Sequence, residues 1–222
     1  MPPRRSNAVS PSPNSGVTVE GMSSTVLYMS MSLDGFITGP DVSPAQGLGF
    51  GGERLHEWVL TGDPDAGLRE AVSNLGPVNQ SVVDEFMSTG AVIAGRGTFE
   101  PAKGWNGDHH DGVPIYILSR HPAPDWAAGW PNVHYVDDLA GAVRDAKAAA
   151  GDRDVLVHGS SIAQRALTLG ILDELQVHLV PVLLGAGTLL FEHLGTGQRE
   201  LERVKVLEGE GGVTHLRYRV LR

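Results

Sequence analysis

A turn of small polar residues, Gly159-Ser160-Ser161, separates two apolar segments that differ in their periodicity. Residues 155–158 form a short apolar run that predicts a buried strand, and residues 160–169 repeat with the period of a helix. Such a turn suits three kinds of chemistry. Either serine can cap the helix, the free N–H groups of the first helical turn can bind a phosphate, or a serine can be the nucleophile of a hydrolase.

The hydrolase hypothesis rests on the spacing GxSxA around Ser161, which is one residue short of the GxSxG motif. Asp173 or Glu174, followed by His193 or His215, would supply the acid and the base in the required order. However, the two acids come directly after the helix that Ser161 begins, and so lie about a helix length from its hydroxyl. No oxyanion segment of the HGGG type precedes the serine. A serine hydrolase is therefore a remote alternative.

Two arginines occupy places comparable to that of the Gly-Ser-Ser turn. The apolar run 91–95 leads directly into Arg96, and the run 114–119 leads into Arg120. Ligands of open α/β sheets bind beyond the carboxyl ends of the strands, and the planar guanidinium group suits phosphate oxygens. A ligand that carries several phosphates is one interpretation. The other is that both arginines are ordinary solvated residues at strand ends.

Two further motifs do not support a site. Gly47, Gly49 and Gly52 match GxGxxG, but they follow a loop rather than a strand, so we reject a dinucleotide fingerprint and expect a mobile lid or a flexible loop. The run Asp108–Asp111 reads DHHD, yet neighbouring side chains do not converge and no distant third ligand stands out. We therefore expect a solvated loop there, and no metal.

Composition limits the remaining possibilities. The chain has 222 residues, a formal net charge of −9 and no cysteine. The negative charge argues against nucleic acid as a partner, and the missing cysteines exclude disulfides and thiol catalysis. No apolar run reaches the ~20 residues of a membrane span. Residues 1–23 are rich in proline and serine and predict a disordered tail, so we expect one domain over residues 24–222 and a cytoplasmic protein.

The elements that would position these residues alternate along the chain. Strands are expected at 25–31, 91–95, 114–119, 133–136, 155–158 and 174–182, helices at 53–60, 80–88, 138–151 and 160–169, and a hairpin of 201–207 with 213–221. Asp137 or Asp138 would cap the helix 138–151. Strands that alternate with helices and end in antiparallel strands indicate an α/β fold with a mixed sheet.

Several of these segments resemble a known family. The runs AVIAGRGTFE, YILSR and VLVHGSSIAQRAL…GILDELQVHLVPVLLGAGTLLF, with SLDGFITGPD before them, occur in the order typical of the dihydrofolate reductase-like superfamily. They are most similar to the C-terminal reductase domain of the bifunctional riboflavin-biosynthesis enzyme and its stand-alone relatives. The resemblance covers roughly residues 24–220. It implies a three-layer α/β/α fold with a mixed, mainly parallel central sheet and a C-terminal antiparallel hairpin, which binds NADPH and often forms a homodimer.

The resemblance also implies roles for particular residues. The cofactor-binding set would be Gly95, Arg96, Gly97 and Thr98 on the adenosine and phosphate side, Ser119 and Arg120 at the 2′-phosphate, Gly159, Ser160, Ser161 and Ile162 at the pyrophosphate, and Gly185 and Gly187 near the nicotinamide. Asp34 and Glu57 are the candidate catalytic residues, with His56 as a further candidate for the substrate pocket.

The resemblance implies an NADPH-dependent reductase, either of the dihydrofolate type or of the 5-amino-6-(5-phosphoribosylamino)uracil type. The chain departs from true dihydrofolate reductases, which carry a Gly-Gly pair where Gly159-Ser160 stands and a Pro-Trp motif that is missing here. We therefore expect a small pterin-like, pyrimidine-like or carbonyl substrate rather than folate. A protein of the same fold that binds the nucleotide without turnover is the alternative.

Overall fold

The computed structural model describes residues 23–43, 45–63, 68–195 and 197–222. The expected tail therefore lies outside the described residues, apart from Ser23. The strands are β1 (Thr25–Ser32), β2 (Phe36–Thr38), β3 (Ala91–Gly95), β4 (Ile115–Leu118), β5 (Val133–Val136), β6 (Val155–His158), β7 (Glu174–Val180), β8 (Thr188–Leu189), β9 (Leu201–Glu208) and β10 (Thr214–Val220). The helices are α1 (Leu68–Ala71), α2 (Pro77–Met87), α3 (Arg96–Phe99), α4 (Leu139–Ala150) and α5 (Ser160–Leu169), with 3₁₀ helices η1 (Gly52–Leu55), η3 (Lys103–Gly107) and η4 (Glu210–Gly212).

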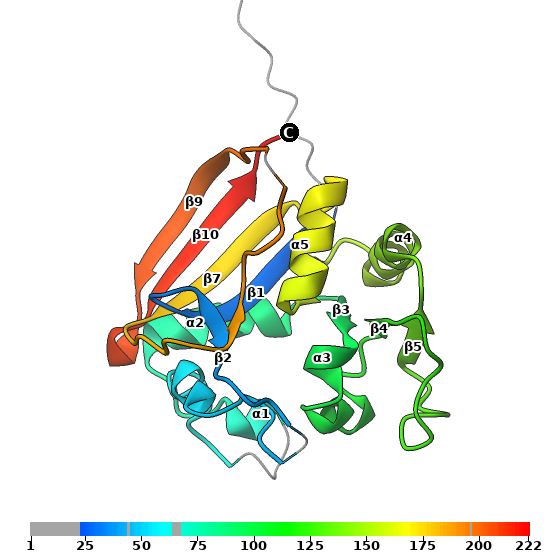
Figure 1. The fold of residues 1–222 in the computed structure, drawn as a ribbon, viewed down its shortest axis with the longest axis horizontal. Helices are drawn as coiled ribbons and strands as arrows, with labels where there is room; N and C mark the ends of the chain where they lie inside the picture. Colours follow the sequence, from blue (N-terminus) through cyan, green and yellow to red (C-terminus); the bar gives the residue numbers. More distant parts are fainter. Residues whose placement is uncertain (1–22, 44, 64–67, 196) are drawn as a thin grey trace, which may run out of the picture.

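Eight of the strands form one sheet in the order β5-β4-β3-β6-β1-β7-β10-β9. Neighbours from β5 to β7 are parallel, and β10 is antiparallel to both β7 and β9. The predicted mixed, mainly parallel sheet with a C-terminal hairpin is therefore confirmed (Figure 1). In this order β3, β6 and β1 lie in the middle of the sheet, so their carboxyl ends meet at one edge.

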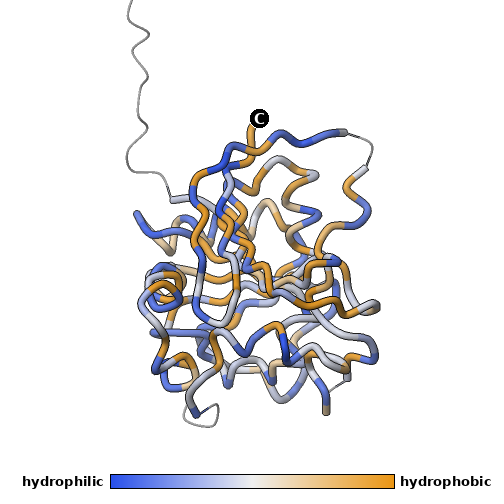
Figure 2. Tube along the Cα trace, turned by 90° about the vertical axis from the view of Figure 1, so that its left-hand side faces the viewer, coloured by the Kyte–Doolittle hydropathy of each residue, from blue (hydrophilic) through white to orange (hydrophobic). Residues whose placement is uncertain are grey.

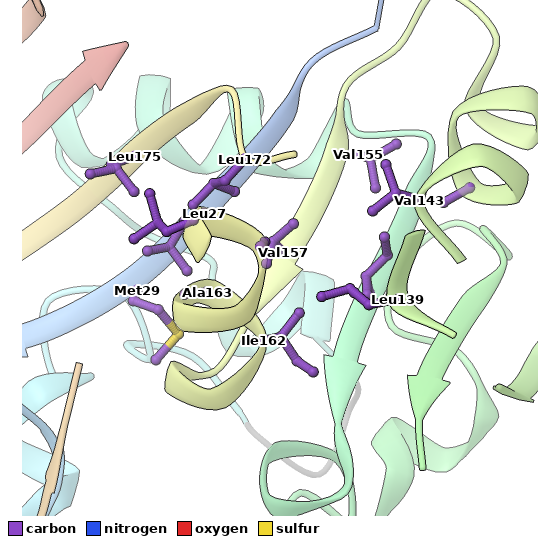
Figure 3. Close-up of a cluster of buried hydrophobic side chains, with 14 of the residues drawn as sticks. Leu27, Met29, Leu139, Val143, Val155, Val157, Ile162, Ala163, Leu172 and Leu175 are labelled. Carbon is purple, nitrogen blue, oxygen red and sulfur yellow. The ribbon is translucent and has the colours of Figure 1, made fainter. Parts of the chain in front are cut away.

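Helices cover both faces of the sheet, which makes three layers. On one face α4 and α5 pack their apolar sides against β1, β3 and β6, and Leu139, Val143, Ile162 and Ala163 belong to this core (Figure 3). On the other face α2 and α3 contribute Phe86 and Phe99 to a second cluster. Figure 2 shows that the hydrophobic stretches of the chain concentrate in the middle of the molecule.

Several element boundaries follow from local signals. β3 and β5 have the predicted bounds, and Asp138 is the N-cap of α4, where its carboxylate accepts from the backbone N–H groups of Ala140 and Gly141. α2 begins at Pro77, three residues earlier than expected, because proline suits the first turn of a helix. The helix expected over 53–60 is only the 3₁₀ turn η1.

Polar and apolar residues alternate along β7, but both of its faces are mostly buried. Glu174, Gln176 and His178 form the polar side of the strand, yet all three are buried. They lie on the face that α2 covers, beside polar residues of β10. This face is therefore a buried polar layer rather than a solvated surface. Within the described residues, no helix is both long enough and apolar enough to cross a membrane.

Candidate functional site

Two of the predicted turns touch each other. β3 and β6 are neighbours in the sheet, so the turn after Gly95 and the turn at Gly159 leave the same edge side by side. A Cβ at Gly95 would lie 3.2 Å from Ser161 Oγ, and a Cβ at Gly159 would collide with the Thr98 hydroxyl. Gly159 also has φ +91°, which L side chains rarely adopt. The contact between the two turns therefore requires glycine at position 159, whereas a Cβ at Gly95 would only crowd the Ser161 hydroxyl.

The start of α5 carries no side-chain cap. Its N-cap is Gly159, and neither serine accepts a hydrogen bond from the first turn, so the prediction that Ser160 or Ser161 caps the helix is wrong. The reason is register, because the helix begins one residue earlier than a capping serine requires. The backbone N–H groups of the first turn are left without intrahelical partners. Ile162 contributes only its backbone here, since its side chain is buried in the core (Figure 3).

The residues of the hydrolase hypothesis do not come together. Ser161 is exposed at the start of α5. Glu174 binds Arg217, with its Oε2 2.5 Å from Nε, and Asp173 binds Lys147. Among the described residues, no hydrogen bond links Ser161 to a histidine. The structure therefore assembles no catalytic triad around this serine.

The two predicted arginines differ in their surroundings. Arg96 is paired with Glu100 one turn later, with 2.6 Å between Nε and Oε1. Arg120 lines a cavity of about 160 Å³ together with Leu118, Ser119, Asp137 and Arg165. Arg165 was not among the predicted site residues, because it lies inside a helix. It follows Ser161 by four residues, so the two lie on the same side of α5.

A larger open hollow of about 510 Å³ adjoins this cavity. It shares Ser119, Arg120 and Asp137 with the smaller one, and Asp138 and Asp145 also line it. The Ser119 hydroxyl accepts from the N–H of His121 at 3.0 Å and donates to its carbonyl at 2.7 Å, so this serine orders its own turn. The positive charge at this edge therefore comes from Arg120 and Arg165.

Asp34 joins two loops at the ends of β1 and β7. Its carboxylate accepts from the Ser32 hydroxyl at 2.5 Å and from the N–H groups of Leu184 and Gly185 at 3.2 and 2.7 Å. The Ser32 hydroxyl and these N–H groups hold the pKa of Asp34 below its usual value. Asp34 therefore stays ionised at neutral pH and fixes the loop that contains Gly185.

The other residues predicted near the substrate are less well placed. Gly187 packs so closely on β2 that a Cβ would collide with the Thr38 carbonyl. Glu57 is exposed and pairs with Arg54 at 3.3 Å. His56 turns inward, and its Nδ1 is buried with no hydrogen-bond partner in the described part of the chain. Of the candidates on this segment, the structure brings only His56 toward the interior.

The interior contains a group of imidazoles that the sequence did not predict. We call His56, His109, His110, His158, His178 and His215 the histidine cluster. His109 and His110 are 2 % and 4 % exposed, so the expectation of a solvated DHHD loop is wrong for its histidines, although Asp108 and Asp111 are exposed. Phe86 of α2 contacts His109, His110 and His158, which explains why the loop turns inward. The described residues hold no group of three or more His, Cys, Asp or Glu that could bind a metal ion.

Burial keeps the histidine cluster neutral. Desolvation is the main cause that lowers the pKa of His158 and of His215 to about 4. The pKa values of His109 and His178 are also lowered well below the usual value, first by burial and then by neighbouring imidazoles. The sequence does carry one signal of the histidine cluster, because His178 and His215 lie next to apolar residues in strands. This pattern does not show which face of the sheet is covered.

Comparisons with known proteins agree with this architecture. Residues 24–214 match the family described as the RibD C-terminal domain, and the chain belongs to that family. A putative riboflavin biosynthesis protein from Shewanella sp. PV-4 has a similar structure, with a TM-score of 0.66 and 20% identity over 90% of this chain and 99% of that chain. A search of curated proteins found no match.

Two further solved structures share the fold. A pyrimidine reductase-like protein from Corynebacterium diphtheriae has a TM-score of 0.58 and 15% identity, over 90% of this chain and 92% of that one. Dihydrofolate reductase from Enterococcus faecalis, complexed with NADP(H) and RAB-propyl, has a TM-score of 0.56 and 12% identity, over 91% of this chain and 98% of that chain. The predicted fold class, a three-layer dihydrofolate reductase-like α/β/α fold, is therefore confirmed.

Proposed function

We propose that this protein is an NADPH-dependent reductase of a small pterin-like, pyrimidine-like or carbonyl substrate. Membership of the RibD C-terminal domain family supports a reductase, and so does the fold it shares with a pyrimidine reductase-like protein and with a dihydrofolate reductase complexed with NADP(H). The observation that carries the proposal is one edge of the sheet, where two touching glycine turns lie beside a cavity with two arginines.

The residues at this edge fit the phosphates of such a cofactor. The uncapped N–H groups at the start of α5 would hold the pyrophosphate, helped by the positive end of the helix dipole. Arg120 and Arg165 would hold the 2′-phosphate in the smaller cavity, where Asp137 reduces the net positive charge from two to one. Gly97 faces open space, because a Cβ there would meet nothing within 4 Å. This leaves room for phosphate beside the two turns.

The bound cofactor would supply the hydride, and the protein would orient the substrate and exclude water. Asp34 is ionised, so it does not supply the proton that completes the reduction. Its part in the proposal is to hold the Leu184–Gly185 backbone in place at the mouth of the site. The neutral histidine cluster would form the water-poor floor beneath the substrate, on the face of the sheet that α2 covers.

Substitution at Gly97 tests the proposed cofactor site, because this position has space and an ordinary backbone conformation. Gly97→Asp should place a carboxylate beside the pyrophosphate and weaken NADPH binding by about tenfold or more. Gly97→Ala is the matched control, and it should fold and bind NADPH within about threefold of the parent. Binding is measured from nicotinamide fluorescence. Unchanged affinity in a folded Gly97→Asp variant would place the cofactor elsewhere.

Turnover distinguishes the reductase from a nucleotide-binding protein of the same fold. NADPH oxidation should be followed with a panel of pterins, pyrimidines, carbonyl compounds and quinones. Oxidation that depends on one of these compounds, and that Gly97→Asp slows at limiting NADPH, supports the reductase. Tight NADPH binding without oxidation by any member of the panel would favour binding without turnover.

A further inference from the structure

A chain of hydrogen bonds that runs into the histidine cluster joins α2, η4, β7, β10 and the turn at Trp58. Asn79 of α2 donates through Nδ2 to the carbonyl oxygens of Trp58 and Glu210, at 3.1 and 3.2 Å. Its Oδ1 lies 3.0 Å from Nε2 of His215 on β10. His215 Nδ1 in turn lies 2.9 Å from Nδ1 of His178 on β7. All three side chains are at least 95 % buried.

This chain fixes the position of every proton along it. Because the Asn79 amide nitrogen donates to two carbonyls, its oxygen is the acceptor and His215 Nε2 carries a proton. A neutral His215 then has a lone pair on Nδ1, which must accept from a protonated His178 Nδ1. His178 is therefore held as the tautomer with an unprotonated Nε2. No described residue donates to that nitrogen.

His178 lies close to the edge of the sheet at which the proposed cofactor would bind. His178 pairs in register with Ser30 of β1, two residues before that strand ends at the edge of the sheet with the cofactor site. The Trp58 indole contacts the His178 ring at 4.6 Å between centroids and donates to Ser30 Oγ at 2.9 Å. The Ser30 hydroxyl proton has no acceptor among the described residues. A hydrogen-bond acceptor and a donor thus lie side by side against an aromatic wall.

We propose that His178 determines substrate specificity in the reductase proposed above, by accepting a hydrogen bond at Nε2 from an N–H donor on the edge of a planar heterocycle. Asn79 and His215 are positioning residues, because they touch only the chain that keeps this nitrogen unprotonated. The substrate class is accordingly an amino- or lactam-bearing heterocycle. A carbonyl compound without an N–H group would leave this lone pair without a hydrogen bond, which costs binding energy.

Two isosteric probes test this proposal. 2,4-Diaminopyrimidine offers N–H donors, and 2,4-dimethylpyrimidine has the same shape without them. The parent should bind the diamino probe about tenfold more tightly than the dimethyl probe, because only the diamino probe can donate to the lone pair of His178 Nε2. His178→Leu should abolish this preference, and His178→Gln, which retains an acceptor oxygen, should restore part of it. Affinities are measured with and without NADPH, so the result does not depend on the proposed cofactor.

The positioning residues are tested by a paired substitution and by a spectroscopic readout. Asn79→Leu frees the His215 proton and should reduce the preference several-fold, whereas Thr89→Val, which alters the neighbouring His109–His110 pair, should not. ¹⁵N NMR of the imidazoles should show His178 protonated at Nδ1 only, and a shift of Nε2 when the diamino probe binds.

Equal affinity of the parent for the two probes would overturn the proposal. So would a preference that survives in a folded His178→Leu variant, or a proton on His178 Nε2. Failure of NADPH to bind the parent would instead remove the proposed function. The probe preference and the NMR spectrum would still decide the role of His178.

Discussion

Arg120, Arg165 and Asp137 share one small cavity, and the balance of their charges decides which nucleotide it favours. Arg120→Ala should weaken NADPH binding by about tenfold or more, because a charge-assisted hydrogen bond to phosphate contributes about 1.5–3 kcal/mol. NADH binding, which lacks the 2′-phosphate, should change little. Asp137→Asn should strengthen NADPH binding, since it removes a repelling charge. Fluorescence titration with both nucleotides measures these effects.

The control for charge alone is Asp152→Asn, which removes a carboxylate outside both cavities. It should leave the affinity for either nucleotide unchanged. Equal losses of NADPH and NADH in Arg120→Ala would show that the arginine binds something other than the 2′-phosphate.

Gln176 is a residue whose burial costs stability. Its side chain is fully buried, and neither amide atom has a hydrogen-bond partner among the residues that the structure describes. Gln176→Leu should therefore raise the free energy of unfolding by about 1 kcal/mol or more, since an unsatisfied buried group costs about 1–3 kcal/mol. Gln164→Leu is the matched control and should lower stability, because Gln164 Nε2 donates to the Leu190 carbonyl at 3.0 Å. Urea unfolding measures both, and a loss of stability in Gln176→Leu would contradict the argument.

At the scale of elements, the starts of α4 and α5 should respond differently to loss of a polar side chain. Asp138→Ala should cost about 1 kcal/mol, because its carboxylate accepts from two backbone N–H groups of α4. Ser161→Ala should change stability by less than about 0.5 kcal/mol, because Gly159 is the N-cap of α5 and no side chain caps it. Urea unfolding compares the two. Comparable losses would mean that Ser161 caps the helix in solution.

Elements with local signals could be predicted from the sequence. β3 is a short run of apolar residues between two turns, and α4 has Asp138 at its start and Gly151 at its end. The short elements β2, β8 and α3 were missed, since each has four residues or fewer and no periodicity that a pattern can detect. Local signals in the sequence therefore determine the positions of the larger elements. They do not determine the positions of the short elements in the loops.

For the same reason, only part of the candidate site could be predicted from the sequence. The turns at Gly95 and Gly159 follow apolar strands, so their meeting at one edge could be expected from strand order. The histidine cluster could not, because His178 and His215 become neighbours only through the pairing of β7 with β10. His109 is buried only because α2 and η3 cover it with Phe86 and Trp105. Tertiary contacts of this kind cannot be deduced from the local sequence.

At the scale of the whole molecule, β9 is an unprotected end of the sheet. Among the described residues no strand pairs with its outer edge, and Leu201, Val204 and Val206 are 41–45 % exposed. Because exposed apolar edge strands favour pairing with another chain, we propose a homodimer that covers β9. Light scattering coupled to size exclusion should give twice the chain mass, and Val204→Lys with Val206→Lys should give the monomer. Lysines at two other exposed apolar positions, Leu169 and Leu183, are the control.

The histidine cluster should make the whole fold sensitive to mild acid. His158 and His215 have pKa values of about 4 in the folded protein, against about 6.5 in an unfolded chain. Below pH 6.5 the unfolded state therefore binds more protons than the folded state. The free energy of unfolding should be highest above pH 6.5 and fall as the pH drops toward 4, with a slope of up to about 1.4 kcal/mol per pH unit for each such histidine.

The range between pH 6.5 and pH 4 separates the effect of the histidines on stability from that of the carboxylates. The pKa values of Asp34 and Asp173 are lowered in the folded protein, so their contribution is lost only at more acidic pH. Urea unfolding at pH 7.5, 6.5, 5.5 and 5.0 should therefore isolate the histidine effect. His158→Gln should flatten the dependence over this range, because it removes a group that takes up a proton on unfolding. His134→Gln, at an exposed position of β5, should run parallel to the parent. A parent whose stability is constant from pH 7.5 to 5.0 would mean that the buried imidazoles are not held neutral by the fold.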